Sequence, residues 1–478
     1  MNRPIRRVAF VAMVMFALLL ANGTFSMIFR QSSLEAQPQN RRVRDAEFAQ
    51  DRGSILAADK LEIASTKDAD DRFKFQRAYP EDELYAPITG FFSYDHGRTG
   101  VESTYNSQLS GTDDSLFVRR LIDMATNRAP QGASVQTTIV PEMQEAAAAG
   151  LGDQKGAVVA LDPKTGAVLA MVTSPSYDPN TVASHDIEEA GKAYESLVED
   201  KDMPLSNRAA REIYPPGSTF KLVTAAAALE DGKKPDSKVD SPSRLKLPGT
   251  TTFLPNSSDC GGTSVTITQA LKVSCNTAFA NLGIELGQDK LREQAEKFGF
   301  GARHLPDLGG VASQFPDELD DAQLGLSSIG QYDVAASPLQ MAMVSAAIAN
   351  DGVLMDPYLV SLVQSPDLKP ISTHKPQKLS EPMTPENAEA LKQMMEVVVS
   401  EGTGRNAQIS GVEVGGKTGT AQSDLSRKPY AWFTSFAPLD DPKVAVAVII
   451  EDADVPRTDI GGGRLAAPIA RAVMEAGL

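Results

Sequence analysis

The amino-acid sequence predicts an α+β protein with three parts: an N-terminal membrane-anchor helix, an elongated α+β pedestal and a larger C-terminal domain. The first observation behind this prediction is an uncharged, apolar stretch near the N-terminus. The second is a set of β-rich segments at both ends of region 151–478, and the third is a long helical interval between them. We therefore expect a five-stranded antiparallel sheet, with the last helix on one face and a helical insertion on the other.

The apolar stretch predicts a transmembrane anchor. Residues 8–29 are uncharged and are numerous enough to cross a bilayer as a helix. A cleaved signal peptide is the alternative, because Ala-Asn-Gly at 21–23 resembles a small-x-small cleavage site. The anchor is favoured because apolar residues resume beyond that site, at Phe25, Met27, Ile28 and Phe29.

The charges that flank the anchor bear on its orientation. Residues 1–7 contain three arginines and are the predicted cytoplasmic tail. Arginines also follow the anchor, at Arg30, Arg41, Arg42 and Arg44, and they weaken the difference in charge. A long domain can be translocated regardless of such charges, so we expect a single-pass plasma-membrane protein with residues 30–478 outside.

The rest of the chain divides near residue 150. Residues 30–150 are polar and turn-rich and make up the predicted pedestal, which precedes the domain at 151–478. Two apolar runs, 157–162 and 167–173, flank a Pro-Lys-Thr-Gly turn and predict a β-hairpin. We expect helices at 218–230, 266–286, 288–298, 337–350, 384–400 and about 462–476, and strands at 412–422, 431–439 and 444–452.

Composition excludes several classes of function. A net charge of −16 argues against nucleic-acid binding, which needs a basic surface. Two cysteines and four histidines are too few for a Cys/His zinc cluster, so no metal is expected. No phosphate-binding glycine motif follows a strand pattern, and no other cofactor is expected.

Ser218 and Lys221 are the first candidates for catalysis. They are three residues apart at the start of an alanine-rich helical pattern, so their side chains share one face. A serine hydroxyl becomes a good nucleophile when a neighbour takes its proton, and a buried lysine with a lowered pKa can do so. The alternative is that Ser218 is only a helix N-cap after the Pro-Pro-Gly turn.

The order of three motifs favours catalysis. The Ser-x-x-Lys pattern also occurs at 243–246 and 372–375, and Lys-Thr-Gly also occurs at 164–166, so each motif alone is weak. Only one ordering places Ser-x-x-Lys on a helix, then Ser-x-Asn at 274–276, then Lys-Thr-Gly at 417–419 on a strand. This ordered set is the signature of penicillin-binding proteins and serine β-lactamases.

The N-terminal half narrows the resemblance to class B penicillin-binding proteins. DRGSILA (51–57) resembles the family's Arg-Gly-x-Ile element, and GVESTYNSQLSG (100–111) resembles its Gly-x-Glu element. SVQTTIVPEMQEAA (134–147) resembles a third family segment, although Val140 stands where that segment usually has aspartate. The whole chain most resembles the short actinobacterial form of the family.

This resemblance implies a peptidoglycan DD-transpeptidase on a penicillin-binding, serine β-lactamase-like fold. Ser218 would attack the penultimate D-Ala of a stem peptide while Lys221 takes its proton. Ser274 would relay a proton to the leaving amine with help from Lys417, and Asn276 would bind the substrate amide and hold Lys221.

The resemblance also implies how the substrate is held. Thr418 and Thr420 would bind the substrate carboxylate, and Gly419 would let its backbone approach the strand. The amides of Ser218 and Thr420 would form the oxyanion hole. β-Lactams would acylate Ser218 and remain bound.

The implied partners are a D-Ala-D-Ala donor peptide, an amine acceptor peptide and the membrane. A polytopic SEDS-family glycosyltransferase and divisome proteins are further implied partners, in a role in cell division, cell shape and cell-wall synthesis. Two alternatives stay open: a serine β-lactamase or DD-carboxypeptidase on the same fold, and a membrane-anchored β-lactam receptor.

The two cysteines lie near the second motif. Cys275 is the middle residue of the Ser-x-Asn motif, and Cys260 lies 15 residues earlier in a polar loop. Two cysteines that are close in sequence and outside the membrane predict a disulfide. The alternative is a pair of free thiols.

Overall fold

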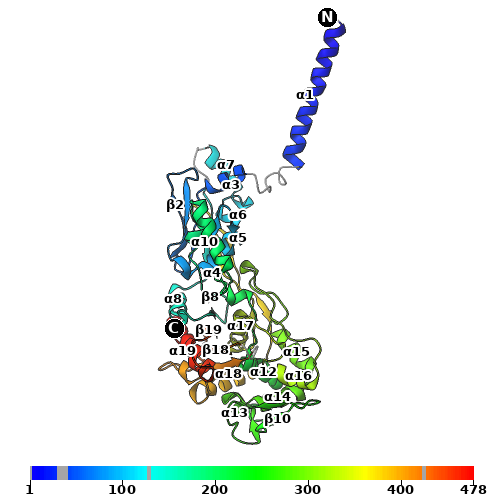
Figure 1. Cartoon of the computed structure of the whole chain (residues 1–478), viewed down its shortest axis with the longest axis vertical. Coiled ribbons are helices and arrows are strands. Elements are labelled where there is room, and N and C mark those ends of the chain that lie inside the picture. Colours follow the sequence, from blue (N-terminus) through cyan, green and yellow to red (C-terminus); the bar gives the residue numbers. More distant parts are fainter. Residues whose placement is uncertain (1–2, 30–40, 126–130, 423–426) are drawn as a thin grey trace.

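The structure is a computed structural model that describes residues 3–29, 41–125, 131–422 and 427–478. Its body is elongated, with the pedestal at one end and the larger domain at the other (Figure 1). Helix α1 (Arg3–Phe29) lies apart from this body and is long and apolar enough to cross a membrane. Arg30, the first residue after the predicted anchor, lies outside the described residues.

The predicted five-stranded sheet is confirmed. Its strands follow the order β17-β18-β19-β7-β8, and every neighbouring pair is antiparallel. Two strands come from the hairpin at the start of the domain and three from the end of the chain. The bounds are β7 (Gly156–Leu161), β8 (Val168–Ser174), β17 (Gly415–Ala421), β18 (Tyr430–Ala437) and β19 (Val444–Ile450).

Both faces of this sheet are covered by helices. Alternate residues of β7 point to opposite faces: Val158 and Ala160 join the core under α8 and α19, whereas Val159 and Leu161 join the core on the other side. Helix α17 covers that other side. The strands β7 and β19 in the interior of the sheet are therefore apolar throughout, as expected for strands buried on both faces. The helices are α8 (Pro141–Leu151), α17 (Pro338–Ala349) and α19 (Gly462–Ala476).

Each expected helix of the insertion forms, with one exception. The expected helix 266–286 is wrong as a single helix, because the chain breaks between α13 and α14. At the break Ser274 has a left-handed φ of 59°, which a helix does not contain. The helices here are α12 (Lys221–Glu230), α13 (Ile267–Lys272), α14 (Asn276–Leu286), α15 (Gln288–Lys297), α16 (Asp321–Ser327) and α18 (Pro385–Ser400).

The insertion also contains three short antiparallel strand pairs. Strands β10 (Arg244–Lys246) and β11 (Phe253–Pro255) form a hairpin, β9 (Lys238–Asp240) pairs with β12 (Ser264–Thr266), and β13 (Leu354–Met355) pairs with β16 (Lys378–Ser380). The hairpin lies at the end of the body farthest from α1 (Figure 1).

The pedestal is built from two separate parts of the chain. Its six-stranded sheet has the order β15-β14-β6-β1-β2-β3. Four strands precede residue 150, but β14 and β15 come from the middle of the region 151–478, so the sheet crosses the sequence boundary near residue 150. The bounds are β1 (Ile55–Leu56), β2 (Glu62–Asp68), β3 (Phe75–Ala78), β6 (Ser134–Thr137), β14 (Val360–Gln364) and β15 (Pro370–Thr373).

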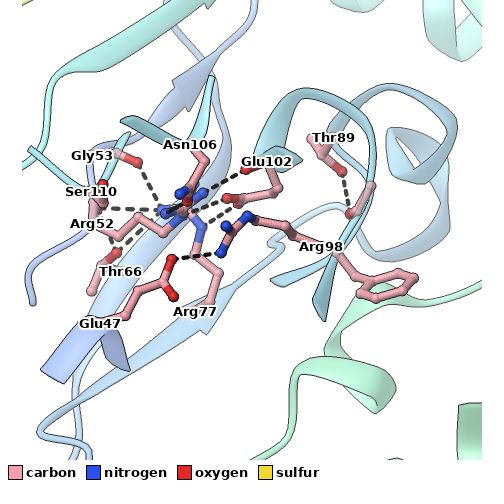
Figure 2. A network of polar contacts seen from close by, with 12 residues as sticks. Glu47, Arg52, Gly53, Thr66, Arg77, Thr89, Arg98, Glu102, Asn106 and Ser110 are labelled. Carbon is pink, nitrogen blue, oxygen red and sulfur yellow. Dashed lines mark hydrogen bonds and ion pairs between the residues drawn. The ribbon is translucent and has the colours of Figure 1, made fainter. Parts of the chain in front are cut away.

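A buried charge cluster joins the elements of the pedestal (Figure 2). Glu102, on the short helix α5 (Gly100–Thr104), is fully buried and accepts from Arg52 Nε and Arg77 Nε at 2.6 Å each. Burial raises the pKa of Glu102, but Arg77 and Arg52 outweigh that effect and hold it below its usual value. Glu102 therefore stays charged and ties β3 and the start of β1 to α5.

Candidate active site

The segment around Ser218 is a tight turn at the mouth of α12. Gly217–Thr219 form a short 3-10 helix, η3, and α12 begins at Lys221 with Phe220 as its N-cap residue. Neither helix has a side-chain cap, so the N-cap interpretation of Ser218 is wrong. Ser218 is partly exposed, while Gly217, Thr219 and Lys221 on either side of it are buried.

Contacts from three parts of the chain hold this turn. The Gly217 amide donates to the Gly330 carbonyl at 2.9 Å, and Trp432 Nε1 donates to the Pro215 carbonyl at 3.0 Å. Gly217 has a φ of 53°, and a Cβ at this position would lie 2.9 Å from the Thr420 carbonyl. Glycine is therefore required here, and the close approach places Ser218 beside the edge strand β17.

Lys221 is buried, and its amine lies within hydrogen-bond distance of three oxygen atoms around the second motif. Its Nζ lies 2.8 Å from the Ser274 carbonyl, 3.3 Å from Ser274 Oγ and 2.8 Å from Asn276 Oδ1. These contacts fix the amine at the start of α12, which directly follows the η3 turn that contains Ser218.

Lys417 approaches the same serine from the other side. It is fully buried on β17, and its Nζ lies 3.0 Å from Ser274 Oγ and 2.9 Å from the Thr418 carbonyl. Ser274 Oγ thus lies between two lysine amines. The arrangement lets Ser274 Oγ take a proton from Lys221 and relay it, while the Lys417 amine lies beside the same oxygen.

Both amines have lowered pKa values. Burial lowers the pKa of Lys221 well below its usual value, and the nearby Lys417 lowers it further. Burial alone lowers the pKa of Lys417 to about 7. Among the described residues, no carboxylate forms an ion pair with either amine. An uncharged Lys221 can therefore accept a proton.

The second motif is held in its turn from outside. Cys275 and Cys260 are joined by a disulfide, which ties the turn to the preceding loop. Asn256 Oδ1 accepts from the amides of Asn276 and Thr277 at 2.9 and 3.0 Å, and so caps α14 in place of Cys275, which provides no side-chain cap. Sequence reasoning missed Asn256, because it lies 20 residues before the helix that it caps.

The third motif lies on β17, an edge strand of the five-stranded sheet. Thr420 is exposed, and Gly419 lies so close to the nucleophile turn that a Cβ would be 3.0 Å from the Pro216 carbonyl. Thr418 Oγ1 shares a hydrogen bond of 2.7 Å with Thr403 Oγ1, from the loop after α18. Thr403 was also missed, since nothing in its own segment indicates that it orients Thr418.

The structure separates these motifs from their duplicates. Lys164 and Gly166 lie in the turn between β7 and β8, where Lys164 pairs with Asp441. The second Ser-x-x-Lys pattern ends on β10, and the third begins on β15. Only the predicted set converges: Ser218, Lys221, Ser274, Asn276, Lys417, Thr418, Gly419 and Thr420.

Comparison with protein-family models gives two matches. Residues 156–475 match the penicillin binding protein transpeptidase domain, and residues 52–135 match the penicillin binding protein A dimerisation domain. Both matches lie in the body of the molecule.

Two curated relatives are similar over the full chain. Peptidoglycan D,D-transpeptidase PbpA of Mycolicibacterium smegmatis is 45% identical, with 100% of this chain and 99% of the relative covered. The protein of the same name from Mycobacterium tuberculosis is 42% identical over the same shares.

Solved structures are similar as well. The ceftriaxone acyl-enzyme complex of penicillin-binding protein A from M. tuberculosis matches with a TM-score of 0.88 and 42% identity, over 91% of this chain and 100% of that chain. Its penicillin G acyl-enzyme complex matches with a TM-score of 0.85 and 43% identity, over 89% and 99%.

Proposed function

The chain belongs to the class B penicillin-binding proteins and is a peptidoglycan D,D-transpeptidase, and we propose that Ser218 is its nucleophile and Lys221 its base. One observation carries this proposal: the amines of Lys221 and Lys417 both lie within hydrogen-bond distance of Ser274 Oγ, at 3.3 and 3.0 Å, and the partly exposed Ser218 lies in the turn just before the helix of Lys221. A base without a counter-ion, beside an accessible hydroxyl, is the arrangement that nucleophilic catalysis needs.

Acylation starts with the uncharged amine of Lys221. It takes the proton of Ser218 Oγ as that oxygen bonds to the penultimate D-Ala carbonyl carbon of the donor peptide. The developing oxyanion is stabilised by the amides of Ser218 and Thr420. When the C–N bond breaks, the proton passes through Ser274 Oγ to the leaving D-Ala amine.

Deacylation reverses these proton movements. The amine of a second stem peptide attacks the acyl carbon and loses a proton to the same lysine and serine pair. The Ser218 ester bond breaks, and Ser218 Oγ regains its proton. A β-lactam acylates the same oxygen, and its ring-opened acyl group stays attached.

The substrate binds between two walls of the site, one formed by the segment of Asn276 and the other by β17. Asn276 Oδ1 holds Lys221, and Asn276 also faces the substrate amide. Thr418, Gly419 and Thr420 bind the terminal carboxylate along β17, near the amine of Lys417. The disulfide between Cys260 and Cys275 keeps the Asn276 wall in place.

Each of four segments of the chain has its own role in this proposal. Residues 1–7 are a cytoplasmic tail, 8–29 anchor the protein, 30–150 supply most of the pedestal, and 151–478 carry out transpeptidation on the extracytoplasmic side. By resemblance to the family, a SEDS-family glycosyltransferase and divisome proteins are its partners, in cell division and cell shape. A membrane pull-down that recovers no such glycosyltransferase would contradict this last part.

Fluorescent penicillin tests the nucleophile. We expect a stable adduct on the wild type and none on Ser218→Ala. Ser243→Ala is the matched control, because it removes the serine of a second Ser-x-x-Lys pattern and should label normally. Labelling of Ser218→Ala would refute the proposal, and rapid loss of label from the wild type would favour a β-lactamase.

A further inference from the structure

The hairpin β10–β11 is part of a basic segment in an acidic protein. The chain has a net charge of −16, yet residues 241–258 contain Arg244 and Lys246 and no aspartate or glutamate. Two other lysines of the helical insertion are paired: Lys233 with Glu285, and Lys272 with Glu401. Arg244 and Lys246, in contrast, form no ion pair with any carboxylate that the structure describes. Their charge is therefore available to a ligand.

The register of the hairpin gathers these charges on one face. Arg244 lies opposite Pro255, and Lys246 lies opposite Phe253, so all four side chains share a face. Phe253 is 46% exposed, and the Arg244 guanidinium lies 5.2 Å from the centre of its ring. The intervening Leu254 points the other way and packs against the core. The outward face thus combines two cations with one exposed aromatic ring.

This face adjoins the active site directly. The Pro255 carbonyl accepts from Asn276 Nδ2 at 3.1 Å, while Asn276 Oδ1 accepts from Lys221 Nζ at 2.8 Å. Asn276 therefore connects the hairpin to the catalytic amine through its own amide group. Cross-strand neighbours have Cβ atoms about 5 Å apart, so the Arg244 side chain starts one strand beyond the residue that contacts Asn276.

We propose that the outward face of β10–β11 is a subsite for a carboxylate-bearing part of the stem peptide, beyond the segment that Asn276 binds. This rests on the proposed function, because it extends the same substrate site. The guanidinium of Arg244 pairs with a carboxylate in a bidentate manner, and Lys246 adds a second positive charge. Phe253 packs against the aliphatic part of the same peptide.

The test compares two synthetic donor peptides on the full-length enzyme in detergent. Both end in D-Ala-D-Ala, and they differ only in one upstream side group, a free carboxylate or its amide. The variant is Arg244→Ser with Lys246→Ser. The charge-matched control is Lys67→Ser with Lys375→Ser, two exposed lysines, one on β2 and one just after β15. Fluorescent penicillin acylation is measured alongside as a readout of the folded active site.

We expect the variant to lower kcat/KM for the carboxylate peptide about tenfold, the equivalent of one charge-assisted hydrogen bond. The amide peptide, penicillin acylation and the control variant should be unaffected. In the wild type, added salt should lower kcat/KM for the carboxylate peptide more than for the amide peptide.

Three results would overturn the subsite. If the variant changes kcat/KM by the same factor for both peptides, the hairpin binds no carboxylate. A parallel loss of penicillin acylation would show that the hairpin only supports Asn276. Absence of acylation in the wild type would refute the proposed function itself, and the subsite with it.

Discussion

The pedestal and the active site each bury two cationic side chains, but they neutralise them in different ways. In the pedestal, Arg52 and Arg77 share the carboxylate of Glu102, and all three groups are buried. In the active site, Lys221 and Lys417 are just as buried, and their described hydrogen-bond partners are hydroxyl, carbonyl and amide oxygens. The same degree of burial therefore meets a full counter-charge in one place and only neutral acceptors in the other.

The difference shows what decides the role of a buried cation. Lys392 provides a third case: its side chain has little exposed surface, but its amine pairs with the exposed carboxylates of Asp351 and Glu389. Burial lowers the pKa of Lys392, yet the bonds to these carboxylates outweigh burial and raise it. A paired cation stays charged and holds structure together, whereas an unpaired one gives up its proton and can act as a base.

The largest expected effect follows from removing the active-site base. Lys221→Ala should lower the rate of penicillin acylation by about 10²–10⁴-fold, the usual contribution of a general base. The measurement is the second-order rate of labelling with fluorescent penicillin. Lys392→Ala is the matched control, because it removes a buried lysine that keeps its charge, and it should acylate at the wild-type rate. Equal losses in both variants would remove the distinction between paired and unpaired lysines.

The next effect breaks the pedestal cluster. Glu102→Gln leaves Arg52 and Arg77 buried without a counter-charge, which should cost about 3–5 kcal/mol of stability. Thermal unfolding followed by circular dichroism would show a lower midpoint. Glu47→Gln is the control, because its ion pair with Arg98 is partly exposed and worth about 1 kcal/mol or less. A Glu102→Gln midpoint equal to that of the control would mean that the cluster is not stabilising.

Removing the disulfide tests whether it stabilises the turn that carries Ser274 and Asn276, whose oxygens surround the lysine amines. Replacing Cys260 and Cys275 with serine should cost about 3 kcal/mol, as expected for a closed loop of this length. It should also slow acylation, since Asn276 follows Cys275 directly. Reductant should lower the unfolding midpoint of the wild type and leave the double variant unchanged. Identical midpoints for the two proteins without reductant would contradict this expectation.

The smallest effect is a pH dependence of stability. Folded Lys417 loses its proton near pH 7, while in the unfolded chain it keeps the proton up to its ordinary pKa of 10.5. Between these values the unfolded state binds more protons, so stability rises with pH by up to about 1.4 kcal/mol per unit. Lys221 adds a contribution of the same sign. Between pH 7 and pH 9, the free energy of unfolding measured with urea should rise less for Lys417→Met than for the wild type. An equal rise in both proteins would show that Lys417 stays charged when buried.

Local sequence patterns were enough to predict most strands of the five-stranded sheet and most of the expected helices. The hairpin of β7 and β8, the three late strands and the last helix all follow from hydrophobic alternation and periodicity, which depend on near neighbours. The one expected helix that failed, 266–286, breaks at Ser274, where a disulfide and the Asn256 cap hold a turn that no local propensity indicates. Likewise, nothing in residues 360–373 predicts that β14 and β15 complete the pedestal sheet.

The sequence by itself determined the chemical groups of the site and their order along the chain: a serine and lysine on one helix, Ser-x-Asn, and Lys-Thr-Gly on a strand. Only the tertiary structure decided that Ser274 Oγ lies between two lysine amines, that Thr403 orients Thr418 and that Glu102 holds two arginines. The physical reason is that burial and long-range contacts set the pKa of a group and its partners. Both depend on residues that are distant in sequence and adjacent only after folding.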